Sequence, residues 1–379
     1  MADHGDILLQ GGHVIDPARN IDGIENVYIS HGHCADYNTS KRPDFVFNVS
    51  NCIVTPGLID FHCHFYHQGT EIGVFPDSAF LPQGVTAIVD QGSAGIANFE
   101  NFYSSCMETT QLHSYAFLNV SPTGLVTTRY MENINPQYFD LDKSAEMLEK
   151  YSGRLLGLKI RQSMEIAGNL ELQPLIATIR MASKLGCSVA VHSTNPPCSM
   201  GKLVNLLRPG DVLCHVFHGK GSHIVDSSGK LIPEIKEARQ RGVFFDTADG
   251  RAHSCISVIQ KALVEGMLPD MISTDQTCGN LYNPVVFGLP VVMSRYLALG
   301  MSLYDVVKSC TATPAKFIGQ SGKIGTLAPG ACGDVAVFRM KQLQWHYKDH
   351  RGESLLCKNV LVPMMTLLNG HFAYRSIEL

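Results

Sequence analysis

The sequence predicts an α/β fold, a (β/α)₈ (TIM) barrel with a small β-domain that both ends of the chain build together. Two observations lead to this prediction. Apolar, strand-like runs alternate with amphipathic helical stretches through the middle of the chain, which is typical of parallel strands covered by helices. Short alternating segments, separated by Gly, Pro and Asn, occupy the beginning of the chain and return near its end.

The barrel strands are predicted where apolar runs of strand length are bounded by polar or small residues. Eight βα units are the number that closes this kind of barrel. The predicted strands are residues 53–64, 84–93, 114–124, 155–163, 187–193, 211–219, 242–250 and 270–276. Between them lie helical patterns such as Leu175, Ile179 and Ala182, with Gly186 as a stop signal.

The two ends of the chain differ from this middle part in their pattern of apolar and polar residues. Residues 6–50 contain short alternating runs, and residues 322–338 read as turn, strand, turn and strand. We therefore predict two units. Residues 55–325 form the barrel, and residues 1–54 combine with residues 326–379 into the small β-domain.

Composition narrows the class of protein. With 45% apolar and 17% charged residues the chain can bury a large core, and its 12 cysteines, without paired spacing, are expected to be buried thiols. A net charge of -4 without a Lys/Arg block does not indicate a positively charged surface for binding nucleic acid or anionic lipid. There is no signal-peptide core and no apolar run of membrane-spanning length. We expect a cytoplasmic protein with a small-molecule substrate and no nucleic-acid or membrane partner, and leave homo-oligomer formation open.

His62 and His64 form an HxH pattern at the end of the first predicted strand. Side chains two residues apart point to the same side of a strand, so both imidazoles can bind one metal ion. Because the chain has 16 histidines, the pattern also arises by chance. The other residues at the predicted strand ends therefore decide whether the pattern indicates a metal site.

Three further polar residues, His192, His215 and Asp275, stand where predicted strands end. These ends meet at the catalytic edge of a barrel. A single buried histidine is commonly a hydrogen-bonded core residue, but several at one edge would each need a separate partner, which a shared metal ion supplies. Nitrogen and oxygen ligands suit Zn²⁺ first, with Mn²⁺, Fe²⁺ or Co²⁺ as alternatives.

Lys159 lies at the centre of the fourth apolar run, where a charged ammonium costs much free energy to bury. One interpretation is a lysine paired with a nearby acid. The other is a neutral amine that reacts with carbon dioxide to form a carbamate, an anionic ligand able to bridge two metal ions. The residue type and its position leave both interpretations open.

This combination resembles the amidohydrolase superfamily, in which strand one carries HxH, strand four a carboxylated lysine, strands five and six one histidine each, and strand eight an aspartate. The residues that match this order are His62, His64, Lys159, His192, His215 and Asp275. More narrowly, TPGLIDFHCH, QGVTAIVDQGSAGIANF, GLKIR, HSTNPP, FHGK and ISTD resemble the deacetylase branch related to dihydroorotases.

The resemblance implies a binuclear zinc hydrolase that cleaves an ester or amide bond by a metal-bridging hydroxide. His62 and His64 would hold one of two Zn²⁺ ions, and His192 and His215 the other. Carboxylated Lys159 would bridge them. The branch further implies deacetylation of O-acetyl or N-acetyl α-carboxylates, such as acetyl-mandelate-like esters and N-acetyl-D-amino acids.

Within this scheme Asp275 would be the catalytic residue, accepting a proton from the attacking hydroxide and passing it to the leaving group. Arg161 is a candidate substrate contact, because it points to the same side of its strand as Lys159 and can bind a carboxylate through its planar fork. The alternative is a salt bridge between Arg161 and a neighbouring acid. His67 and Lys220 are further candidates near the mouth of the barrel.

The loops after the sixth to eighth predicted strands depart from the pattern of the branch, and such loops choose the substrate. The residues that look unusual there are His218, Arg251, His253 and Gln276.

Other functions remain open at this point. A cyclic amidase acting on a dihydroorotate- or hydantoin-like ring needs the same metal ions and differs only in its loops. A barrel that binds metal but has lost catalysis would serve as a regulatory or assembly subunit. A single-metal isomerase or lyase would tolerate the replacement of Lys159.

Overall fold

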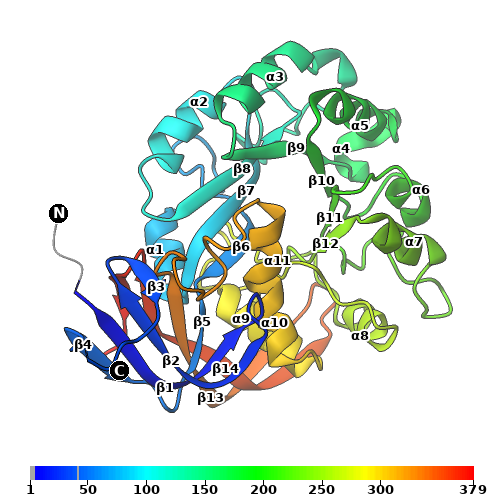
Figure 1. Ribbon diagram of the computed structural model, residues 1–379. Helices are drawn as coiled ribbons and strands as arrows, with labels where there is room; N and C mark the ends of the chain where they lie inside the picture. The colour runs from blue at the N-terminus through cyan, green and yellow to red at the C-terminus, as the bar shows by residue number, and fades with distance from the viewer. Residues whose placement is uncertain (1–4, 41) are drawn as a thin grey trace.

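The computed structural model describes residues 5–40 and 42–379. At its centre, seven parallel strands follow one another in chain order and curve into a nearly closed barrel (Figure 1). The strands are β6 (Leu58–Cys63), β7 (Val85–Gly95), β8 (His113–Asn119), β9 (Leu155–Arg161), β10 (Ser188–His192), β11 (Val212–Cys214) and β12 (Phe244–Asp246). The predicted barrel architecture is confirmed.

The eighth predicted strand, residues 270–276, is not a regular strand. It closes the barrel through two isolated parallel bridges, one from Met271 to β12 and one from Gln276 to β6. Between the bridges, the Ser273 and Thr274 amides donate to side chains instead, at 3.1 Å to Thr247 Oγ1 and 3.1 Å to Asp60 Oδ1. These side-chain acceptors replace part of the backbone ladder, so the segment is extended but irregular.

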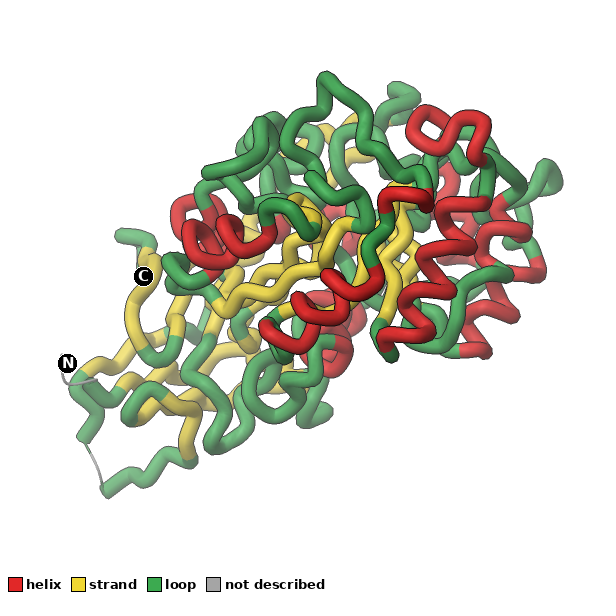
Figure 2. Tube along the Cα trace, turned by 90° about the horizontal axis from the view of Figure 1, so that it is seen from above, coloured by secondary structure: helices red, strands yellow, loops and turns green. Residues whose placement is uncertain are grey.

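Helices lie around the outside of the strands (Figure 2). The helices are α1 (Pro76–Phe80), α2 (Phe99–Phe102), α3 (Leu141–Lys150), α4 (Met164–Ala167), α5 (Gln173–Leu185), α6 (Met200–Val204), α7 (Pro233–Arg241), α8 (Ile256–Val264), α9 (Leu289–Ala298), α10 (Leu303–Cys310) and α11 (Ala312–Phe317). Helix α5 follows its prediction: Leu175 and Ala182 are buried, and Gly186 caps the helix in a left-handed conformation at φ 66°.

Both ends of the chain build a second, largely antiparallel sheet, as predicted. Its strands are β1 (Ile7–Asp16), β2 (Ile21–Ser30), β3 (His33–Ala35), β4 (Phe45–Asn48), β5 (Ile53–Pro56), β13 (Val335–Lys348), β14 (Ser354–Leu368) and β15 (His371–Arg375). Strand β5 pairs with both β1 and β13 and then continues through Gly57 into β6, so this sheet anchors the first barrel strand. The exact boundary between the two units stays a prediction.

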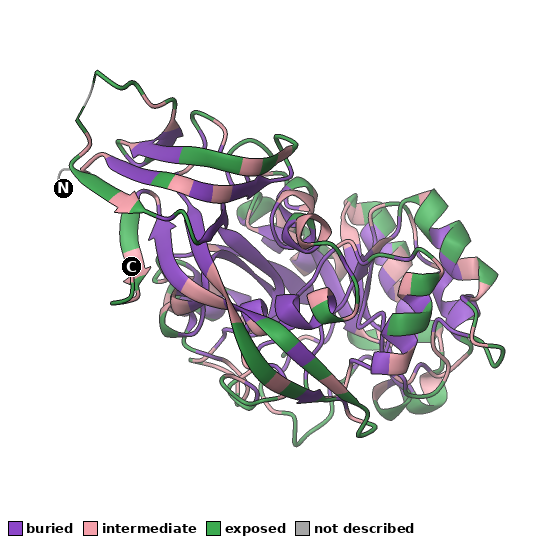
Figure 3. Cartoon of the chain, turned by 90° about the horizontal axis from the view of Figure 1, so that it is seen from below, coloured by how far each residue is buried: buried purple, intermediate pink, exposed green. Residues whose placement is uncertain are grey.

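Burial follows the layers. The barrel strands are buried along their length, whereas the outer faces of the helices are exposed (Figure 3). The cysteines of the described residues are all unpaired, and most of them are buried. None of the helices in the described part of the chain combines the length and hydrophobicity needed to cross a bilayer.

Candidate metal centre

A cavity of about 300 Å³ opens at the carboxyl ends of the barrel strands. Polar side chains from the first, fourth, fifth, sixth and eighth predicted strands reach it, as the pattern of the sequence predicts. The six predicted metal ligands all line this cavity: His62, His64, Lys159, His192, His215 and Asp275. The structure thus brings together residues that are more than two hundred positions apart in the chain.

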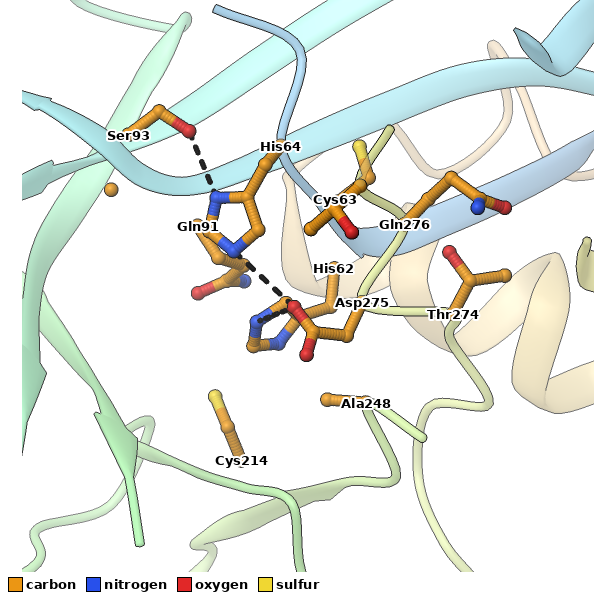
Figure 4. A network of polar contacts seen from close by, with 12 residues as sticks. His62, Cys63, His64, Gln91, Ser93, Cys214, Ala248, Thr274, Asp275 and Gln276 are labelled. Atoms are coloured by element: carbon orange, nitrogen blue, oxygen red, sulfur yellow. Dashed lines mark hydrogen bonds and ion pairs between the residues drawn. The ribbon is translucent and has the colours of Figure 1, made fainter. Parts of the chain in front are cut away.

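The two histidines of the HxH pattern meet Asp275 across the top of the barrel (Figure 4). His62 lies within β6 and His64 directly follows the strand, so the two rings point into the same space. The distance from Asp275 Oδ1 to Nε2 is 3.6 Å for His62 and 3.3 Å for His64. These three side chains therefore present their ligand atoms to one point.

The other ring nitrogen, Nδ1, of each of these histidines forms a hydrogen bond with a neighbouring residue. His62 Nδ1 lies 2.8 Å from a carboxylate oxygen of Asp246, and His64 Nδ1 lies 2.8 Å from Ser93 Oγ. His215 Nδ1 lies 2.7 Å from the Ala248 carbonyl oxygen. Because a carbonyl only accepts, the His215 proton resides on Nδ1 and the lone pair on Nε2. Metal-binding histidines are typically oriented by such partners.

Burial keeps the central imidazoles neutral. It lowers the pKa of His62, His192 and His215 well below the ordinary value of 6.5, and neighbouring cationic groups, Lys159 among them, lower it further. The rings also crowd one another, with centroids 4.2 Å apart for His192 and His215. Neutral imidazoles with a free nitrogen are the form that binds metal ions.

Lys159 stands in the middle of β9 with a side chain that is 2% exposed. Its Nζ donates to Gln91 Oε1 at 3.2 Å and contacts Cys214 Sγ at 3.5 Å. The acid partner that the first interpretation requires is not found for it among residues 5–40 and 42–379. A residue with a side chain at position 92 would clash with Lys159, because its Cβ would lie 2.7 Å from Lys159 Cβ. Gly92, at φ 80°, leaves this space to the lysine side chain.

Asp275 occupies a constrained position at the end of the eighth segment. Its φ of 51° is unusual for a residue other than glycine. Its amide donates to the His62 carbonyl at 2.7 Å, and its own carbonyl accepts from Asn280 Nδ2 at 2.8 Å. These bonds at both ends fix the carboxylate above the histidines.

His253 joins the site although the sequence marks it only as an unusual loop residue. Its Nε2 lies 3.7 Å from Asp275 Oδ2, its Nδ1 lies 2.9 Å from Thr194 Oγ1, and its ring centroid is 4.2 Å from that of His215. Burial lowers its pKa to about 4, against the opposing effect of Asp275. Its place depends on a tight turn after β12, which the sequence signals only through Gly250.

These donors fit a pair of metal ions. Two groups of three potential ligands share Asp275, one with His62 and His64 and one with His215 and His253, and within each group the ligand atoms lie within 4.8 Å of one another. Neutral imidazole and carboxylate are ligands that Zn²⁺ prefers. The described residues thus match the donor set that a divalent metal centre requires.

The three candidate substrate contacts are placed differently. Arg161 lines the cavity, but its guanidinium already pairs with Glu132, at 2.7 Å from Nη1 to Oε2. His67 and Lys220 lie outside the cavity lining. The His67 ring packs against Phe75, with centroids 4.7 Å apart, and Lys220 is exposed. Their roles in substrate binding stay predictions.

Known proteins similar in sequence point to one family. Residues 209–365 match the model of the amidohydrolase family. A deacetylase of Agrobacterium fabrum is 30% identical over 324 residues, which cover 85% of this chain and 79% of the relative. A deacetylase of Brucella anthropi is 31% identical over 84% of this chain and 79% of its own length.

Solved structures give the same fold. A crystal structure of a dihydroorotase superposes with a TM-score of 0.89 at 29% identity, over 98% of both chains. A crystal structure of an adenine deaminase gives a TM-score of 0.89 at 23% identity, over 98% of this chain and 100% of that one.

Proposed function

This chain belongs to the amidohydrolase family, and from that premise we propose that it is a binuclear zinc deacetylase acting on O-acetyl or N-acetyl α-carboxylates. The observation that carries the proposal is the convergence of four histidines, a buried lysine and an aspartate on one cavity. The names of the two bacterial relatives, both deacetylases, support the acetyl group as the part removed.

In this proposal His62 and His64 would hold one Zn²⁺ ion, and His192 and His215 would hold the other. Lys159 would supply an anionic carbamate ligand, once its neutral Nζ had bonded to the carbon of CO₂ and lost a proton. Bound zinc ions lower the pKa of water and polarise a carbonyl group. His253 would be a further potential ligand beside His215 and Asp275.

The protein's own groups then carry the protons. Asp275 accepts a proton as water adds to the acetyl carbonyl carbon, and returns it to the leaving oxygen or nitrogen when the acyl bond breaks. Its two oxygens face His64 and His253 from opposite sides, at 3.3 and 3.7 Å. Asp246 and the Ala248 carbonyl keep the rings of His62 and His215 in position.

A cyclic amidase is the second candidate. The observation in its favour is the dihydroorotase structure, which matches this chain over 98% of its length at 29% identity. It needs the same donors, so the substrate alone distinguishes it from a deacetylase.

Elemental analysis of the purified protein tests the metal centre. We expect about two zinc ions per chain in the wild type, as the six donors imply, and fewer in Lys159→Ala. Lys184→Ala, on the exposed side of α5, is the matched control and should keep the wild-type metal content. One metal ion or none in well-folded wild type, unchanged in Lys159→Ala, would overturn the binuclear site.

The same preparations test the reaction. Wild type should hydrolyse O-acetyl and N-acetyl α-carboxylates, and Lys159→Ala should lose this activity together with its metal. Opening of dihydroorotate or hydantoin rings, without deacetylation, would replace the proposed function by the cyclic amidase.

A further inference from the structure

The cavity wall carries two arginines outside the metal centre, and their charges are compensated differently. Arg161 forms its ion pair with Glu132, whose side chain is 2% exposed. The second oxygen of Glu132 accepts from Asn119 Nδ2 at 3.0 Å. Both oxygens of the Glu132 carboxylate therefore have partners within the protein. The charge of Arg161 is compensated by Glu132 without a ligand.

Arg251 lines the same cavity without such a partner. Its guanidinium forms no hydrogen bond or ion pair with any other side chain in the described part of the chain. A Cβ at Gly279 would lie 3.7 Å from Arg251 Cζ, so the guanidinium rests against the loop that follows Asp275. Arg251 is thus an exposed cation at the cavity wall with which no acidic side chain of residues 5–40 and 42–379 forms an ion pair.

Arg251 belongs to the turn after β12, and the backbone of this turn lies against Asp275 and His253. Gly250, at φ 50°, packs so tightly that a Cβ there would lie 2.6 Å from both Asp275 Oδ2 and His253 Cδ2. Arg251 is the next residue, so its backbone starts about 3.8 Å along the chain from this contact. Arg251 thus belongs to the same turn that presents His253.

The rest of the wall offers no competing anchor for a charged ligand. Apart from the six predicted metal ligands, His253 and the two arginines, the lining side chains are uncharged, among them Ile72, Leu125, Thr128, Thr277 and Asn280. Besides these groups, a ligand in this cavity therefore meets apolar and uncharged polar side chains and one arginine, Arg251, that is not paired with an acid of the described residues.

We propose that Arg251 determines substrate specificity by binding a carboxylate that lies close to the acyl group being removed. The inference rests on the proposed hydrolase function and names its substrate class as small anionic acyl compounds. The planar fork of arginine binds a carboxylate through two parallel hydrogen bonds. Arg161, held by Glu132, shapes the wall and does not anchor the substrate.

Steady-state kinetics with a charged substrate and its neutral analogue test this. The probes are O-acetylmandelate and its methyl ester, and the variants are Arg251→Met, Arg251→Lys, Arg161→Met and the exposed control Arg180→Met on α5. In Arg251→Met the ratio of kcat/KM for acid over ester should fall about 10- to 100-fold, the range of a charge-assisted hydrogen bond. Arg251→Lys should retain part of the preference, and Arg180→Met all of it.

Binding of mandelate, measured by calorimetry, separates this inference from the hydrolase proposal. Weaker binding to Arg251→Met than to wild type supports the inference even where neither ester is hydrolysed, an outcome that would overturn only the proposed deacetylation. Hydrolysis with the same acid-to-ester ratio in wild type and Arg251→Met would overturn the inference and leave the hydrolase intact. A ratio lost in Arg161→Met and kept in Arg251→Met would also overturn it.

Discussion

Histidines at the two ends of the barrel are held in opposite protonation states. At the carboxyl ends of the strands, burial lowers the pKa of His62, His192 and His215 well below 6.5. At the other end, His113 begins β8 and its Nε2 lies 2.9 Å from Asp334 Oδ2. Burial lowers its pKa too, but hydrogen bonds with Asp334 and Cys332 outweigh this effect and raise it to about 9.

A carboxylate partner is not what distinguishes the two ends, because His62 also has one in Asp246. Burial is the largest influence on the pKa at both ends; at His62 the neighbouring cations add to it, whereas at His113 the hydrogen-bond partners outweigh it. Lys159 and other histidines surround His62, whereas His113 faces Asp334 and Cys332. Both ends contain three potential ligands within 4.8 Å of one another. The neutral imidazole of His62 is in the form that binds a metal ion. The protonated imidazole of His113 instead forms a salt bridge with Asp334.

The largest effect is expected from Asp275→Asn at the catalytic end. Asparagine keeps the size of the side chain but cannot accept and return a proton. We expect kcat to fall by about 10²- to 10⁴-fold, the usual contribution of general acid–base catalysis. Steady-state kinetics together with metal analysis measure this. An Asp275→Asn protein with full metal content and full turnover would remove Asp275 from the proton-transfer role.

A smaller effect is expected from Asp246→Asn, which weakens the support behind His62. The loss of such a partner typically lowers metal affinity about 10- to 100-fold. Competition with a chelator measures that affinity. Asp334→Asn is the matched control, because it weakens the equivalent histidine–carboxylate contact at the other end and should leave metal affinity unchanged. Equal metal affinities for Asp246→Asn and wild type would contradict the assigned role.

The catalytic end was largely predictable from the sequence, because every predicted ligand except Lys159 stands where an apolar run ends, and strand ends meet in a barrel. Lys159 lies inside its strand, and the family resemblance assigned it to the site. The position of His253 could not be predicted, since it depends on the backbone at Ala248 and Gly250, with φ of 40° and 50°. The ion pair between Arg161 and Glu132 could not be predicted either. Glu132 comes from the long connection between β8 and β9, whose path no periodicity encodes.

The eighth strand was predicted as regular because residues 270–276 have the right apolar pattern. Its ladder is interrupted by hydrogen bonds to the side chains of Thr247 and Asp60, and such acceptors are invisible to a pattern of hydrophobicity. The salt bridge of His113 escaped prediction for a related reason. Asp334 lies 221 positions away in the chain, and only the folded sheet brings the two together.

The smallest effect is expected from His113→Gln, and it concerns stability. A raised pKa means that the folded protein holds the proton more tightly than the unfolded chain. The stabilisation is therefore fully present below the ordinary pKa of 6.5 and is lost as pH rises through about 9. Because the His113 side chain is 23% exposed, we expect roughly 1–2 kcal/mol, less than the full shift would give.

Urea unfolding of wild type and His113→Gln at several pH values measures this contribution. The difference in the free energy of unfolding should be constant below about pH 6 and shrink steadily between pH 7 and pH 10, since the shifted proton is released in that interval. Titratable groups that do not contact His113 are common to both proteins and cancel in the difference. A difference that grows with pH would mean that His113 is neutral in the folded protein, and the contrast between the two ends of the barrel would disappear.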